Sequence, residues 1–140
     1  MTFQAAAVPG LTAVVAGLRM QPRMPSLSIT ALALLPATGM LVLFYSLAIH
    51  THRSLGGWPT TIGTHGFPPS LVTHSNLAFG YFAVVLMLNL VAWPTVTALC
   101  VFIRRWRIGI YYLGVYALSF VAAFGAMLLA PSPFLYWWRD

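Results

Sequence analysis

The chain has 140 residues, of which 60% are hydrophobic and 6% are charged, with a mean hydropathy of +0.86. A water-soluble domain needs about a quarter of its residues charged to keep its surface hydrated. This composition therefore excludes the soluble classes and predicts an integral membrane protein. The formal charge of +6 comes from seven basic residues, all arginines, against the single acidic residue Asp140. The arginines stand in small groups at the ends of apolar runs, which is a topology signal, so we expect no nucleic-acid partner.

Residues 1–25 form the first predicted segment. Its apolar part, Ala5–Leu18, is too short to span a membrane and is interrupted by Pro9–Gly10. A secretory signal would carry its positive charge before the apolar part, whereas here Arg19 follows it. We therefore expect an uncleaved segment that lies in the cytoplasmic interface.

Three charge-free apolar runs follow, each longer than the roughly 20 residues that cross a hydrocarbon core. They predict transmembrane helices over residues 26–50, 77–103 and 108–130, with kinks at prolines inside the first two. The four-residue turn 104–107 predicts that the second and third helices form an antiparallel hairpin. The expected fold is an all-α integral membrane protein of three transmembrane helices plus the short N-terminal interfacial segment.

The arginines predict an orientation, because cytoplasmic loops of membrane proteins are enriched in basic residues. Five arginines fall on one side of the expected membrane and two on the other: Arg19, Arg23, Arg104, Arg105 and Arg107, against Arg53 and Arg139. The N-terminus and the 104–107 turn are then cytoplasmic. The loop 51–76 and the tail 131–140 are extracytoplasmic, in what we expect to be a bacterial inner membrane.

Polar and small residues inside the spans predict helix packing. Thr38, Asn89 and Ser119 fall near the middle of their helices, where an unsatisfied amide is costly. We expect Asn89 to face another helix, with Thr38 or Ser119 as its hydrogen-bond partner. A stripe of small residues on the third helix should let the second helix approach closely: Ser119, Ala122, Ala123, Ala126 and Ala130.

Aromatic residues stand at the expected membrane boundaries, where their amphipathic rings are favoured. The predicted interface anchors are Trp58, Trp106, Tyr136, Trp137 and Trp138. The terminal group follows Pro131 and Pro133 and is dense enough to suggest docking against another membrane subunit as a second interpretation.

All four histidines lie within the segment His50–Asn76, and imidazole is a common ligand of copper, zinc and haem iron. His50 and His74 should stand at the same membrane interface and are the candidate cofactor ligands. The candidate metal ligands are His50, His52, His65 and His74. His50 and His52 would point about 200° apart on a continuing helix, and no Cys, Asp or Glu lies nearby, which favours structural histidines over a complete zinc set. Haem, copper, zinc and a chlorophyll-type pigment stay open as ligands.

The same segment carries one resemblance. Arg53-Ser54-Leu55-Gly56-Gly57-Trp58-Pro59, with a histidine before it and Pro68-Pro69 and His74 after it, resembles a pattern of small uncharacterised bacterial membrane proteins with three or four spans. The pattern covers about a fifth of the chain. That type has no established activity, so the resemblance implies no catalytic residue.

The sequence has no carboxylate pair, no Ser/His/Asp set and no phosphate-binding glycine loop, so we expect no catalytic residues and no enzyme. The expected function is that of an accessory subunit of a larger membrane complex, such as a respiratory or photosynthetic assembly. Its partners would be the lipid bilayer, with bound lipid, and other membrane subunits. The alternatives are a cofactor-binding protein that uses the histidines and a small oligomeric transporter.

Overall fold

The computed structural model describes residues 25–60 and 63–140, and the regular elements in these ranges are all helices. Residues 1–24, which hold nearly all of the expected interfacial segment and both of its arginines, lie outside the described residues. The helices are α2 (Leu27–Leu55), α3 (Pro69–Phe102), the short 3-10 helix η1 (Arg104–Trp106), α4 (Gly109–Met127) and α5 (Ser132–Arg139).

Helices α2, α3 and α4 are each long and apolar enough to cross a membrane. This confirms the prediction of an all-helical chain with three such helices, but the predicted boundaries of the first connection are wrong. Helix α2 continues to Leu55 and α3 begins at Pro69, so the predicted loop 51–76 is reduced to residues 56–68. Three of the four histidines therefore lie on helices, and only His65 lies in the loop.

The end of α2 is fixed by Gly56, whose φ of 67° lies in the left-handed region that favours glycine. A helix does not stop where the apolar residues stop, because its backbone hydrogen bonds continue through polar residues. The polar residues 50–54, which follow the apolar run, therefore belong to the last turns of α2. We call the end of the bundle where α2 ends and α3 begins the histidine end, and the end with the α3–α4 turn the arginine end.

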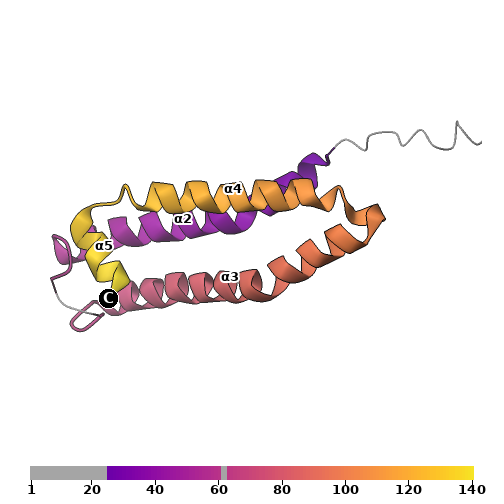
Figure 1. The fold of residues 1–140 in the computed structure, drawn as a ribbon. Coiled ribbons are helices and arrows are strands. Elements are labelled where there is room, and N and C mark those ends of the chain that lie inside the picture. The colour runs from indigo at the N-terminus through magenta and orange to yellow at the C-terminus, as the bar shows by residue number, and fades with distance from the viewer. Residues whose placement is uncertain (1–24, 61–62) are drawn as a thin grey trace, which may run out of the picture.

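Helices α2 and α4 lie side by side and run in the same direction, whereas α3 diverges from both (Figure 1). Helix α3 bends in its second half, which contains Pro94, as expected where proline removes a backbone hydrogen bond (Figure 1). The short turn joins α3 to α4, but α4 packs mainly on α2 and only a little on α3. Helices α3 and α4 thus run in opposite directions from the turn but pack little on each other, so the predicted hairpin arrangement is not confirmed (Figure 1).

The small-residue stripe of α4 contacts α2, which corrects the expectation that it meets α3. Ala123 is buried, and the backbone carbonyl of Ala126 accepts a hydrogen bond of 2.5 Å from the Tyr45 hydroxyl of α2. Ser119 is half-buried and Ala122 is exposed, so not all of the predicted small residues are buried in the contact with α2. Close approach to α2 is what the small side chains permit.

Helices α2 and α3 approach each other closely at Gly39. The Tyr81 hydroxyl of α3 donates a hydrogen bond of 3.1 Å to the carbonyl of Pro36. A Cβ atom at Gly39 would collide with that hydroxyl and its ring, so the missing side chain leaves the space that Tyr81 fills. This contact holds α3 against α2 before α3 diverges.

Helix α5 lies across the histidine end, between α2 and α3 (Figure 1). The sequence predicted an aromatic tail here and no further helix. Proline at the first turn of a helix is well tolerated, since the amide it lacks would have no partner there. Helix α5 carries a proline at this position. Its Phe134 is fully buried and lies 5.1 Å, ring to ring, from Phe44 of α2.

The tryptophans of α5, which the sequence predicts as interface anchors, pack inward against other parts of the chain. Trp137 is buried, and its indole nitrogen donates a hydrogen bond of 2.8 Å to the carbonyl of Gly63. Trp138 is half-buried and stacks on Phe79 of α3, with ring centroids 4.4 Å apart. Trp58 is also half-buried and lies 5.9 Å from Phe134, as expected if the tail packs beside it. Tyr136 and Trp106 remain exposed, at 70% and 49%.

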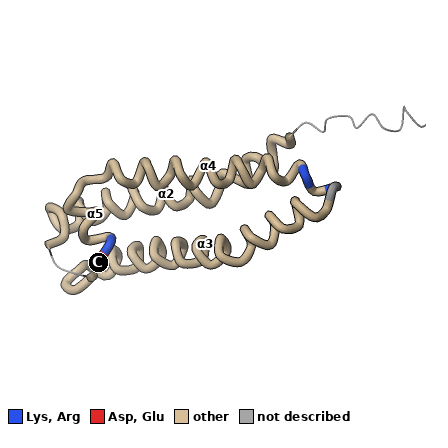
Figure 2. The backbone as a smooth tube through the Cα atoms, in the orientation of Figure 1, with Lys and Arg blue, Asp and Glu red and all other residues tan. Residues whose placement is uncertain are grey.

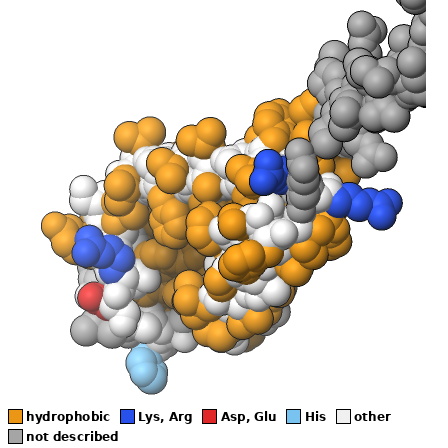
Figure 3. Space-filling view, turned by 45° about the vertical axis from the view of Figure 1, so that its right-hand side comes forward, with side chains coloured by type: hydrophobic (Ala, Val, Ile, Leu, Met, Phe, Trp, Pro, Cys, Tyr) orange, Lys and Arg blue, Asp and Glu red, His pale blue; other side chains and the backbone are white. Residues whose placement is uncertain are grey.

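The surface separates charge from apolar side chains. The arginine positions of the described residues lie at the two ends of the bundle, with none along the helices between (Figure 2). Hydrophobic side chains cover most of the visible lateral surface (Figure 3). Such a surface is what a hydrocarbon environment requires.

Candidate functional site

Two histidines meet at the histidine end. The Nδ1 atoms of His50 on α2 and His74 on α3 lie 2.9 Å apart, and the ring centroids are 5.2 Å apart. Both side chains are half-buried. The structure thus brings together the two candidate cofactor ligands, although they are 24 residues apart in the chain.

A third side chain, Ser46, lies within hydrogen-bond distance of this pair, and the direction of its hydroxyl hydrogen sets the tautomers of the two rings. The Ser46 hydroxyl donates its one hydrogen to the carbonyl of Leu43, at 3.0 Å, and lies 3.1 Å from Nε2 of His74. With this donation, Ser46 accepts a hydrogen bond from His74 Nε2, and His74 Nδ1 accepts the Nδ1 hydrogen of His50. In this tautomer a neutral His50 ring carries a lone pair on Nε2.

That lone pair has no hydrogen-bond partner among the residues the structure describes. A ligating histidine typically uses its second nitrogen to donate a hydrogen bond, which fixes the tautomer and the ring orientation. His50 has this arrangement, with His74 as the acceptor. His74 has both nitrogens engaged and offers no free lone pair.

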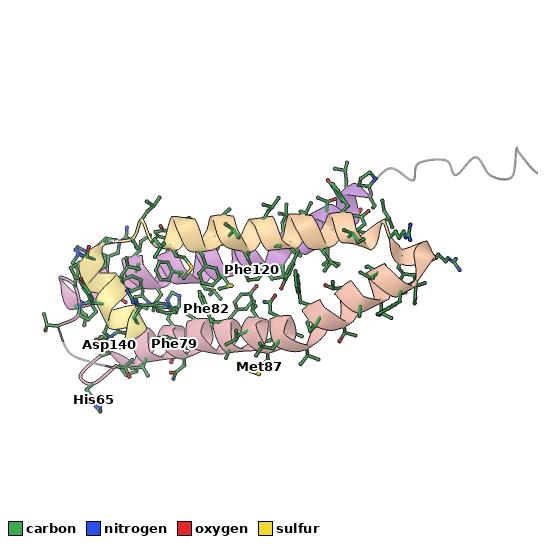
Figure 4. All side chains as sticks on the ribbon, viewed as in Figure 1. His65, Phe79, Phe82, Met87, Phe120 and Asp140 are labelled. Carbon is green, nitrogen blue, oxygen red and sulfur yellow. The ribbon has the colours of Figure 1, made fainter. Side chains whose placement is uncertain are left out.

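The remaining candidate ligands do not join the pair. His52 lies against Trp58, with ring centroids 4.6 Å apart, and His65 is exposed and points away from the helices (Figure 4). Within residues 25–60 and 63–140, no group of three or more His, Cys, Asp or Glu side chains could hold a metal ion. The four-histidine metal site is therefore not assembled in the described part of the chain.

A haem held between His50 and His74 does not fit this arrangement. Two imidazoles on opposite faces of one iron would place their nitrogens about 4 Å apart, given bonds of about 2.0–2.1 Å, with the flat macrocycle between them. The two rings are instead in direct hydrogen-bond contact at 2.9 Å. The geometry allows at most one axial ligand, from Nε2 of His50.

Two buried hydroxyls lie beside the histidine pair in sequence. Thr51 and Ser75 are fully buried, and their hydroxyls have no hydrogen-bond partner among the described residues. Ser75 is one helical turn from Phe79, which stacks on Trp138, so this face of α3 is turned toward α5. The histidine end therefore holds more polar groups than a simple apolar cap needs.

A second feature is a groove of about 710 Å³ where α3 diverges from α4. Phe79 and Phe82 of α3 and Phe120 of α4 point into the space between the helices, whereas Met87 points away (Figure 4). The lining is apolar except for the side chains of Asn89 and Tyr116.

Asn89 does face another helix, but not through the expected partners. Its Oδ1 accepts a hydrogen bond of 2.7 Å from the Tyr116 hydroxyl of α4, and its Nδ2 donates to the carbonyl of Val85 at 2.8 Å. Thr38 and Ser119 instead bond to carbonyls of their own helices. An amide carries two donor hydrogens, and among the described residues Asn89 uses one of them.

Sequence reasoning missed Ser46 and Tyr116. Ser46 lies four residues before His50, and Tyr116 lies three residues before Ser119. Both spacings are about one helical turn, so each residue lies on the same helix face as a predicted site residue. For Tyr116, the length of the side chain could have indicated the contact with Asn89, since a tyrosine hydroxyl extends much farther from its helix than a serine or threonine hydroxyl does.

No protein-family model, curated protein or solved structure matches this chain. The fold and the two features above define its class: an all-helical protein with three helices that are long and apolar enough to cross a membrane. One end of this bundle holds a histidine pair, and its side holds an open apolar groove with a polar pair in the wall.

Proposed function

We propose that the chain is a non-catalytic accessory subunit of a larger complex in a bacterial inner membrane, and that a transmembrane helix of a partner lies in the groove between α3 and α4. The observation that carries the proposal is the Asn89 amide in the groove wall, with one donor hydrogen unused by the described residues. A lipid acyl chain cannot accept this hydrogen, whereas a hydroxyl or carbonyl of a partner helix can.

The loose packing of the chain supports this function. Buried residues make up only 17% of the most apolar stretch of α2 and 11% of those of α3 and α4. Most of the apolar surface must therefore be covered by something outside the described residues. Aromatic side chains that project into an open groove offer a partner helix a large contact area at little entropic cost.

Adjacent positions on α3 give a matched test by photocrosslinking in native membranes. Leu86 lines the groove, whereas Met87 points away from it (Figure 4). A photoreactive amino acid at Leu86 should produce a crosslink to one defined membrane protein, and the same amino acid at Met87 should not. The crosslinked protein should also co-migrate with the chain on a native gel. Equal crosslinking from both positions, or crosslinks to lipid alone from Leu86, would contradict the proposal.

The histidine pair favours a second candidate function, the binding of a metal-containing tetrapyrrole such as haem or a chlorophyll-type pigment. The macrocycle supplies four metal ligands, so a single neutral imidazole is enough to complete the site. His50 offers that ligand through Nε2, and its Nδ1 is oriented by His74. A free copper or zinc ion would need more protein ligands than the described residues bring together.

The absorbance of protein purified from native membranes tests this second function. A bound tetrapyrrole should give visible bands in the wild-type protein that are lost in His50→Gln. The bands should persist in His52→Gln, because His52 is on the other side of α2 and contacts Trp58. A wild-type spectrum with protein absorbance alone, or bands that survive in His50→Gln, would exclude His50 as the axial ligand.

A further inference from the structure

The arginine end of the bundle has no acidic residue to balance it. Arg104, Arg105 and Arg107 lie within the short connection from α3 to α4. The only acidic side chain of the whole sequence is Asp140, which follows α5 at the opposite end. The guanidinium groups of Arg105 and Arg107 therefore have no carboxylate side chain of the sequence near enough to pair with, and their counter-charge comes from outside the chain.

A cavity of about 500 Å³ opens at this end among α2, α3 and α4. Four lining residues carry polar groups, and most of the others are apolar. The polar ones are Arg105, Trp106, Tyr112 and Tyr116, and the apolar ones include Ala33, Val96 and Leu113. Tyr112 also accepts a hydrogen bond of 2.6 Å from the backbone amide of Ser26, which ties the start of α2 to the start of α4 beside the cavity. Positive charge and an amphipathic ring thus border a space suited to hydrocarbon.

We propose that this cavity binds one anionic phospholipid, with the phosphate on Arg105 and an acyl chain in the apolar part. Guanidinium forms bidentate, charge-assisted hydrogen bonds with phosphate oxygens. Basic pockets between transmembrane helices near the membrane surface are suited to anionic headgroups for the same reason. Trp106 is about half exposed, and indole rings favour the headgroup region. The cavity shares Tyr116 with the groove that contains Asn89, but the lipid proposal uses neither Tyr116 nor Asn89 and so does not depend on the proposed function.

Two features of the cavity distinguish this ligand from its nearest alternatives. A free phosphate ion would use Arg105 but would leave the apolar lining empty. A neutral phospholipid would fill the lining, but its own choline group would compete for the phosphate. An anionic phospholipid is the ligand that uses both the charge and the hydrocarbon surface.

Native mass spectrometry of the full chain in detergent tests the proposal, with phosphatidylglycerol and phosphatidylcholine of identical acyl chains. We expect one phosphatidylglycerol to be retained about tenfold more strongly than phosphatidylcholine, as one charge-assisted contact implies. Excess inorganic phosphate should not displace it. Equal retention of the two lipids would overturn the proposal, and complete displacement by phosphate would show a simple anion site instead.

Three variants locate the site. Arg105→Gln should reduce the preference for phosphatidylglycerol to near unity, whereas Arg139→Gln, which removes an arginine from the opposite end, should leave it unchanged. Val96→Trp should reduce retention of both lipids, because the indole fills the cavity. Arg105 is exposed, so its replacement does not disturb the packed core. A preference that survives in Arg105→Gln, or falls equally in Arg139→Gln, would assign it to general surface charge and refute the site.

Discussion

Replacing Phe134 by alanine should cost about 3–5 kcal/mol of the free energy of unfolding, the range for deleting a buried aromatic side chain from a packed core. Phe134 is fully buried, and its ring meets Phe44 of α2 at 5.1 Å and Trp58 of the loop at 5.9 Å. Its loss would leave a cavity where α5, α2 and the loop converge. Helix α5 has only eight residues and depends on such contacts, because a helix of this length is not stable alone.

Tyr136→Ala is the matched control, because Tyr136 is on the same helix but is 70% exposed. It should change stability by less than about 0.5 kcal/mol. Unfolding in mixed detergent micelles, followed by tryptophan fluorescence, measures both variants. Trp137 and Trp138 flank the altered site, so the signal reports the detachment of α5 directly. Similar losses in the two variants would mean that α5 does not pack as the structure shows.

The case of α5 also shows where sequence reasoning stops. Length and apolarity predicted the three long helices, because a charge-free run of this length has few other uses. They could not predict that the tail folds back as a helix. Whether a proline breaks or begins a helix depends on the residues that follow it and on what they contact.

The contact partners of the helices were equally beyond the sequence. Helices α3 and α4 are joined by a short turn, yet α4 packs mainly on α2. All three helices are apolar around most of their circumference, so composition alone does not distinguish one neighbour from another. Specific contacts determine which helices pack together. Examples are the approach of Tyr81 to Gly39 and the hydrogen bond from the Tyr45 hydroxyl to the Ala126 carbonyl.

The sequence predicted which histidines lie near each other but not how their rings make contact. The sequence placed His50 and His74 at the same end of neighbouring helices, and helical spacing separated His50 from His52. The sequence could not predict the direct contact between the two rings or the contact of Ser46 with His74. Both depend on how α2 is rotated about its axis relative to α3. That rotation is fixed by packing at Leu47 and Leu71, which carry no sequence signal beyond being apolar.

Cysteine labelling in intact cells should give an all-or-none difference between the two ends of the bundle. With the buried Cys100 replaced by alanine to remove background, Thr64→Cys should be labelled fully by an impermeant thiol reagent. Trp106→Cys should stay unlabelled until the membrane is permeabilised. The reason is the arginine count of five against two, which predicts that the α3–α4 turn is cytoplasmic and the 56–68 loop is outside.

The two positions make the test stringent, because Trp106 is about half exposed and Thr64 is more buried. Local accessibility alone would thus favour labelling at position 106, so only the membrane can produce the expected pattern. A permeant reagent should label both cysteines and serves as the control. The reverse pattern would invert the orientation and place the histidine pair on the cytoplasmic side, and labelling of both positions in intact cells would contradict a single membrane-spanning orientation. The reverse pattern would also place the proposed anionic-lipid site in the outer leaflet, because the arginine end would then face away from the cytoplasm.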